Sequence, residues 1–107
     1  MGKFVIKRRT NGDYQFNLKA DNGQIILSSQ GYATRSSCEN GIVSVKRHAQ
    51  ADSNFERKKS ANGKHYFNLK AGNGEIIGTS EMYEGTSSMD NGISSVMKNA
   101  PNASIEE

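Results

Sequence analysis

The chain is short and basic, with 107 residues and a formal net charge of +3 at pH 7. Hydrophobic residues make up 34% of it, enough for one two-layer core but not for several domains. No apolar run approaches the roughly 20 residues that span a bilayer, and residues 1–10 lack the apolar stretch of a secretory signal. A single cysteine, Cys38, excludes an intramolecular disulfide and suits a reducing compartment. We therefore expect a cytoplasmic monomer with no membrane partner.

The sequence contains an internal duplication. Shifting it by 51 positions places residues 4–49 over residues 55–100 without a gap, and 23 of the 46 aligned pairs are identical. Both copies carry the run Asn-Gly-x-x-x-Phe-x-Leu-Lys-Ala-x-Asn-Gly-x-Ile-Ile, at 11–26 and 62–77. Such a repeat predicts two copies of one structural unit. We predict a single domain, residues 1–107, made of these two repeats.

Three strands are expected at the start of each copy. Asn-Gly pairs between alternating apolar and polar residues indicate hairpins with type I′ turns, in which both residues take positive φ. In the middle strand Phe16 and Leu18 point to one side, and Asn17 and Lys19 to the other, so one sheet face is buried and one is wet. The predicted strands are residues 4–9, 14–20 and 24–30 in the first copy, and 54–59, 65–71 and 75–80 in the second.

A helix should follow the strands of each copy. The motifs Ser36-x-x-Glu39 and Ser87-x-x-Asp90 resemble capping boxes at its start. Apolar residues then recur at helical spacing, and Pro101 ends the second helix. The matching stripes are Cys38, Ile42, Val45 and Ala49, and Met89, Ile93, Val96 and Ala100.

Gly41 and Gly92 lie inside these helices, where glycine costs about 1 kcal/mol relative to alanine. We expect the compensation to be a close approach of the helix to the sheet. Neither unit buries much alone, so the two should share one sheet. The sequence thus predicts an α+β fold: a tandem β-β-β-α(-β) duplication with one shared antiparallel sheet and two helices on one face.

The repeated runs at 11–26 and 62–77 resemble the YegP-like family of small bacterial proteins, and residues 78–83 and 90–93 extend the resemblance. The resemblance implies tandem β3-α-β motifs that form one sheet and exchange their C-terminal strands. By that analogy residues 54–59 bridge the two copies, and residues 103–107 form a last strand packed on the first copy. It implies no established activity and supplies no catalytic residue.

Residues for catalysis do not cluster in the sequence. It has no Gly-rich phosphate loop, no Gly-x-Ser-x-Gly elbow and no paired metal-ligand spacing. His48 and His65 belong to different elements, and the other copy has Asn99 and Tyr14 at these positions. Cys38 belongs to the apolar helix stripe. We therefore predict no catalytic residue, no metal and no cofactor.

The outer sheet face is the first candidate binding surface. It should carry Lys7, Asn17 and Lys19 from the first copy and Lys58, Asn68 and Lys70 from the second, as a polar, basic platform suited to phosphate groups. An ordinary solvated face is the alternative. Charge is concentrated in the first half: residues 1–51 hold eight Lys/Arg and three Asp/Glu, a net +5, against six and eight, a net −2, in residues 52–107.

The second candidate is a pair of tyrosines, Tyr32 and Tyr83, in the segments between strand and helix, where loops often carry function. The alternative is a tyrosine that folds over the edge of the core. Our leading hypothesis is a non-enzymatic binding module that reaches a protein partner by pairing at a sheet edge. Weak nucleic-acid binding through the basic outer face of the first copy is the second, and an enzyme of unrecognised type is the third.

Overall fold

A computed structural model describes residues 2–106, so both ends of the predicted domain 1–107, and with them the last residue of the predicted strand 103–107, lie outside the described residues. Each copy provides three strands and a 14-residue helix, as the duplication predicts. In chain order the strands and α-helices are β1 (Lys3–Arg8), β2 (Tyr14–Lys19), β3 (Ile25–Ser28), α1 (Arg35–His48), β4 (Phe55–Lys59), β5 (His65–Lys70), β6 (Ile76–Thr79), α2 (Thr86–Asn99) and β7 (Ser104–Glu106). Short 3₁₀ turns at Asp52–Asn54 and Ala100–Asn102 follow the two helices.

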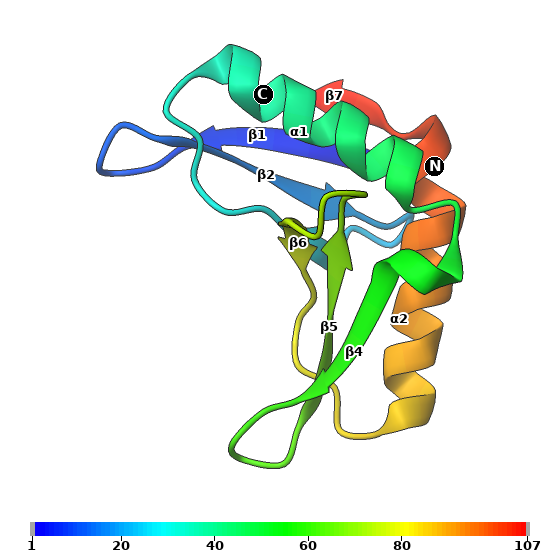
Figure 1. Cartoon of the computed structure of the whole chain (residues 1–107). Helices are drawn as coiled ribbons and strands as arrows, with labels where there is room; N and C mark the ends of the chain where they lie inside the picture. The colour runs from blue at the N-terminus through cyan, green and yellow to red at the C-terminus, as the bar shows by residue number, and fades with distance from the viewer. Residues whose placement is uncertain (1, 107) are drawn as a thin grey trace.

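All strands of residues 2–106 belong to one sheet, in the order β4-β5-β6-β3-β2-β1-β7. The pairs are antiparallel except β1 with β7, which run parallel. Figure 1 shows α1 along β1 and β2, and α2 along β4 and β5. The pairing of β3 with β6 joins the strands of the two copies into one sheet. The predicted α+β duplication, with its shared sheet, is confirmed, and β7 is the strand that returns to the first copy.

The two copies meet at an approximate two-fold axis between β3 and β6, where Ser28 pairs with its own counterpart Thr79. One position beside this axis has no room for leucine in both copies. Leu27 is fully buried, and its counterpart Gly78 leaves the space that the Leu27 side chain fills. A Cβ on Gly78 would lie 2.6 Å from Leu27 Cγ and Cδ2. The duplication therefore needs one large and one small residue at this seam.

The core lies between the sheet and the two helices. Its rings pack in the same way in both copies: Phe4 meets Phe16 edge-on at 5.7 Å, and Phe55 meets Phe67 at 5.6 Å. The helix stripes predicted from spacing are the buried helix faces, including Ile42 and Ile93. Burial of the Phe/Leu side of the middle strands against the helices is confirmed.

The hairpin turns differ from the predicted type I′ geometry. Only their glycines have positive φ, for example 90° at Gly12, and no other residue of 2–106 does. The Gly12 N–H donates to the Arg9 carbonyl, which makes a type I turn followed by a left-handed glycine. The preceding asparagine stays right-handed because its side chain accepts from the backbone two residues on, as Asn11 Oδ1 does from Asp13 N–H at 3.0 Å.

The helix starts were also predicted wrongly: each cap residue lies two residues before the Ser that the capping-box motif indicates. The residue before α1 is Thr34, whose hydroxyl accepts the Ser37 N–H at 3.1 Å, so Ser36 lies inside the helix. The residue before α2 is Gly85, and the Ser88 hydroxyl bonds to its backbone instead. In both copies the residue with the extended backbone of a cap, Thr34 or Gly85, comes before the Ser-x-x-acid motif.

Candidate functional site

A row of side chains crosses the sheet on the face away from the helices. The strand registers join one residue from every strand into this row, which passes through the two-fold axis between Ser28 and Thr79. From β7 to β4 the row is Glu106, Val5, Asn17, Ser28, Thr79, Asn68 and Glu56. The structure therefore brings Asn17 and Asn68 toward one another, as members of a single surface.

Asn17 and Asn68 are nevertheless buried, with 8% and 6% of their surface exposed, so the prediction that they are wet is wrong. Each occupies a middle strand, and longer side chains two residues away on the same face stand on either side of it. Thr79 Oγ1 donates to Asn68 Oδ1 at 2.8 Å, which satisfies the amide locally. The two asparagines therefore belong to the outer face but are not freely accessible on it.

The four predicted lysines occupy this same face. Lys7 and Lys58 are exposed, whereas Lys19 and Lys70 are half-buried. Lys70 is not a free cation, because its Nζ lies 3.0 Å from Glu56 Oε2. That hydrogen bond lowers the pKa of the Glu56 carboxyl. The face is basic, as predicted, but part of its charge is neutralised within the chain.

Tyr32 and Tyr83 lie at the edge of the core rather than in free loops. Their backbones pair with those of Tyr14 and His65, and their rings stack on Phe16 and Phe67 at centroid distances of 6.2 and 6.3 Å. Burial raises the pKa of both hydroxyls.

The tyrosine rings explain the two helix glycines. A Cβ on Gly41 would collide with the Tyr32 hydroxyl, and one on Gly92 with the Tyr83 hydroxyl. The expected close approach of the sheet is also present at Gly41, where a Cβ would lie 3.1 Å from the Phe16 ring. The glycines therefore make room chiefly for a ring that closes the core.

His48 and Cys38 hold structural positions. His48 Nδ1 lies 2.8 Å from the Ser44 carbonyl oxygen, and its Nε2 accepts the Gly72 N–H at 3.2 Å, which ties the end of α1 to the β5–β6 turn. Cys38 is buried, and burial raises the pKa of its thiol, which disfavours the nucleophilic thiolate.

Residues 2–106 contain no group of three or more His, Cys, Asp or Glu arranged to hold a metal ion. In the same part of the chain, no helix has both the length and the apolar character needed to cross a membrane.

The two ends of the sheet differ, and sequence reasoning did not find this difference. At one end β7 pairs with β1, and Lys3 Nζ lies 3.3 Å from Glu106 Oε2. At the other end β4 is the last strand, and within residues 2–106 no strand pairs with its outer side. We call this outer side of β4, residues 55–59, the open edge.

The duplication itself explains the open edge. Counting back 51 residues from β7 gives residues 53–55, and these lead into β4 or belong to it. β7 covers β1, so the equivalent segment of the first copy would cover β4. That segment is the start of β4 itself, and a strand cannot pair with itself. A sign of this in the sequence is the unequal first strand: Val5 and Ile6 correspond to Glu56 and Arg57.

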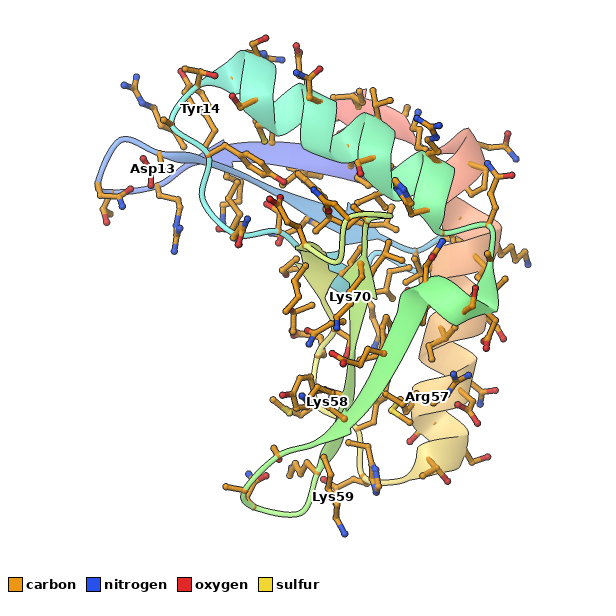
Figure 2. The ribbon with its side chains drawn as sticks, in the orientation of Figure 1. Asp13, Tyr14, Arg57, Lys58, Lys59 and Lys70 are labelled. Carbon is orange, nitrogen blue, oxygen red and sulfur yellow. The ribbon has the colours of Figure 1, made fainter. Side chains whose placement is uncertain are left out.

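Charged side chains line the open edge. The Arg57 guanidinium binds Asp90 of α2 at 3.0 Å and Asp52, in the 3₁₀ turn before β4, at 3.1 Å. Lys58 lies on the opposite side of the strand, and Lys59 near the hairpin end (Figure 2). Beside these residues is a hollow of about 300 Å³, whose lining includes Lys59, His65, Thr86 and Met89.

The comparison with known proteins matches the duplication. The family model of the domain of unknown function DUF1508 matches the chain twice, at residues 10–56 and 60–107. The chain belongs to this family. Each DUF1508 match runs through a helix and ends near the segments 53–55 and 104–106, which are equivalent in the duplication.

The relatives are bacterial and similar over nearly their whole length. The chain is 48% identical over 106 residues to the UPF0339 protein in the ptx operon 5′ region of Stutzerimonas stutzeri, covering 99% of this chain and 96% of the relative. It is 47% identical over 107 residues to the UPF0339 protein YegP of Yersinia pestis, covering 100% and 96%. These family descriptions assign no activity.

Two solution NMR structures share the fold. YegP from E. coli, described as a protein of unknown function, has a TM-score of 0.93 at 40% identity, with 98% of this chain and 90% of that chain covered. A UPF0339 protein from Shewanella oneidensis has a TM-score of 0.92 at 42% identity, with 98% and 89% covered. The resemblance to YegP-like proteins inferred from the repeated runs is confirmed.

Proposed function

We propose that this protein is a non-enzymatic binding module that captures an extended segment of a partner protein at the open edge. The observation that carries the proposal is the difference between the two ends of the sheet. β1 is covered by β7, whereas β4, its counterpart, pairs with no strand on its outer side within residues 2–106.

An unpaired strand edge offers backbone N–H and C=O groups to another extended segment, and strand addition at such an edge is a common way of binding peptides. The chain already shows this form of pairing once. β7 is only three residues long, and it pairs in parallel with β1 through Lys3, Phe4 and Val5. A short segment is therefore enough to extend this sheet.

Amide chemical shifts of the full ¹⁵N-labelled chain test the proposal. Extended peptides of mixed sequence are added, and we expect the amides of Phe55–Lys59 to shift while those of Lys3–Val5, which face β7, do not. Peptides that shift neither strand, or that shift only the β1 end, would contradict strand addition at the open edge.

Nucleic-acid binding through the outer face is the second candidate, because Lys7, Lys19 and Lys58 share that face. Phosphate contacts of this kind weaken steeply with salt. Titration of labelled RNA and DNA at two salt concentrations tests it. We expect binding at low salt that falls when Lys7 and Lys19 are both changed to alanine. Absence of binding at low salt would remove this candidate.

We further propose that the protein works as a monomer in the cytoplasm. The buried, unpaired thiol of Cys38 supports a reducing compartment. Antiparallel pairing of two β4 strands centred on Lys58 would place Lys58 beside Lys58 and Arg57 beside Lys59, and these like charges oppose self-association in that register. Sedimentation equilibrium across a wide concentration range would reveal any self-association.

A further inference from the structure

We propose that the segment captured at the open edge is acidic, with carboxylates placed beside Lys58 and Lys59. This inference rests on the proposed strand addition and names the chemistry of its partner. The occupant is an extended segment of another protein, not a second copy of this chain.

The charges at the open edge favour an acidic strand. β4 ends in Arg57, Lys58 and Lys59, all exposed. Arg57 already binds Asp52 and Asp90, so the cations left for a partner are Lys58 on the outer face and Lys59 beside the hollow. A docked strand presents alternate side chains to the two faces. Carboxylates on either face would therefore meet a lysine.

The covered end of the sheet provides the precedent. β7 is itself an acidic segment, with the sequence Ser-Ile-Glu, and Glu106 reaches across to Lys3 of the strand that it covers. The same type of contact at the open edge would use Lys58, which lies on the same face as its counterpart Lys7. An acidic strand beside a basic edge is thus a pairing that this sheet already contains.

A second copy of β7 fits the open edge poorly. In the register that it has on β1, its Glu106 would lie beside Glu56 instead of Val5. Asn54 would also replace Lys3, so the ion pair would be lost. Glu56 therefore disfavours self-pairing, while Lys58, two residues further along the same face, attracts an acidic partner in a shifted register.

Three short synthetic peptides test the inference on the full ¹⁵N-labelled chain. One alternates valine with glutamate, one valine with glutamine and one valine with lysine. We expect the glutamate peptide to shift the amides of Phe55–Lys59 at the lowest concentration, and its affinity to fall as salt rises. The lysine peptide should bind most weakly.

Two matched variants locate the charge contact. Lys58→Glu should weaken the glutamate peptide about tenfold, because one attraction becomes a repulsion. Lys7→Glu changes the equivalent exposed lysine at the other end of the sheet and should change the affinity less than about twofold. Both side chains are exposed, so neither change should prevent folding.

The outcomes separate the two proposals. If all three peptides shift the β4 amides equally, the inference of an acidic partner is wrong, while the proposal of strand addition is supported. No β4 shift with any of them would remove both. β4 shifts that appear with rising protein concentration and no peptide would identify a second copy as the occupant, which contradicts the inference.

Discussion

The middle strands of the two copies are nearly the same, whereas their first strands, β1 and β4, have diverged. The run Phe16–Ala20 is repeated residue by residue at 67–71, but Val5 and Ile6 of β1 correspond to Glu56 and Arg57 of β4. The difference follows from position. β1 lies between β2 and β7, while within residues 2–106 no strand pairs with the outer side of β4. A strand at an open edge is protected from unwanted pairing by charged side chains.

Substitutions at the seam between β3 and β6 should cause the largest loss in the free energy of unfolding. Gly78→Leu should cost about 3 kcal/mol by overpacking, and Leu27→Gly about 4 kcal/mol through the lost side chain and the cavity. The exchange of both residues should recover most of the loss, because the seam again holds one large and one small residue. Urea unfolding of the three variants measures this. An exchange variant as unstable as the sum of the single changes would contradict it.

The first strands of the two copies, β1 and β4, should respond differently when a helix-facing side chain is removed. Ile6→Ala should cost about 3 kcal/mol because Ile6 is buried. Arg57→Ala should cost about 1 kcal/mol or less, since its ion pairs with Asp52 and Asp90 are exposed. Unfolding free energies at low and high salt check this, and only the Arg57 effect should shrink with salt. Equal losses at both sites would show that the edges are not distinct.

The helix glycines should respond equally in the two copies. Gly41→Ala and Gly92→Ala should each cost about 1–2 kcal/mol, because the clash with a tyrosine ring exceeds the gain in helix propensity. Adding Tyr83→Phe to Gly92→Ala should relieve part of the loss. Gly72→Ala is the control, since a Cβ at Gly72 would meet no atom closer than His48 Nε2 at 3.8 Å. Thermal unfolding that shows stabilisation by either helix substitution would contradict this account.

The smallest effect concerns Glu56 of β4, whose counterpart in β1 is Val5. The hydrogen bond from Lys70 lowers the pKa of its carboxyl. A lowered folded-state pKa stabilises the fold above the pKa of the unfolded chain, and this contribution is lost as pH falls through the folded value. In an NMR titration Lys70→Met should raise the pKa of Glu56, whereas Lys19→Met in the first copy should not. An unchanged pKa in Lys70→Met would be evidence against this ion pair.

The sequence was sufficient for the repeated parts of the fold. Alternation around Phe16 and Phe67 and the stripes through Ile42 and Ile93 identify strands, helices and the buried face, because these depend on local periodicity. The turn type and the helix caps were missed by small margins. They depend on which residue of a short segment takes the turn or cap conformation, and Asn-Gly or Ser-rich segments allow more than one.

The site was harder to predict because it depends on position within the sheet. Sequence alternation placed the six Lys and Asn residues on one face, but it could not show that Asn17 and Asn68 lie under their neighbours. The sequence also did not reveal the open edge. This edge arises because the first copy has no separate strand equivalent to β7. The signal was present in the unequal pair Ile6 and Arg57, which becomes meaningful only with the strand order known.

Amide hydrogen exchange of the full chain tests most directly whether the two edges differ. In the free protein, the amides of β1 that face β7 should exchange slowly, and the amides of β4 that point away from β5 should exchange at nearly unprotected rates. Adding the valine–glutamate peptide should slow only the latter group. Outward β4 amides that are as protected in the free protein as those facing β7, or that stay unprotected with saturating peptide, would contradict an open edge that binds.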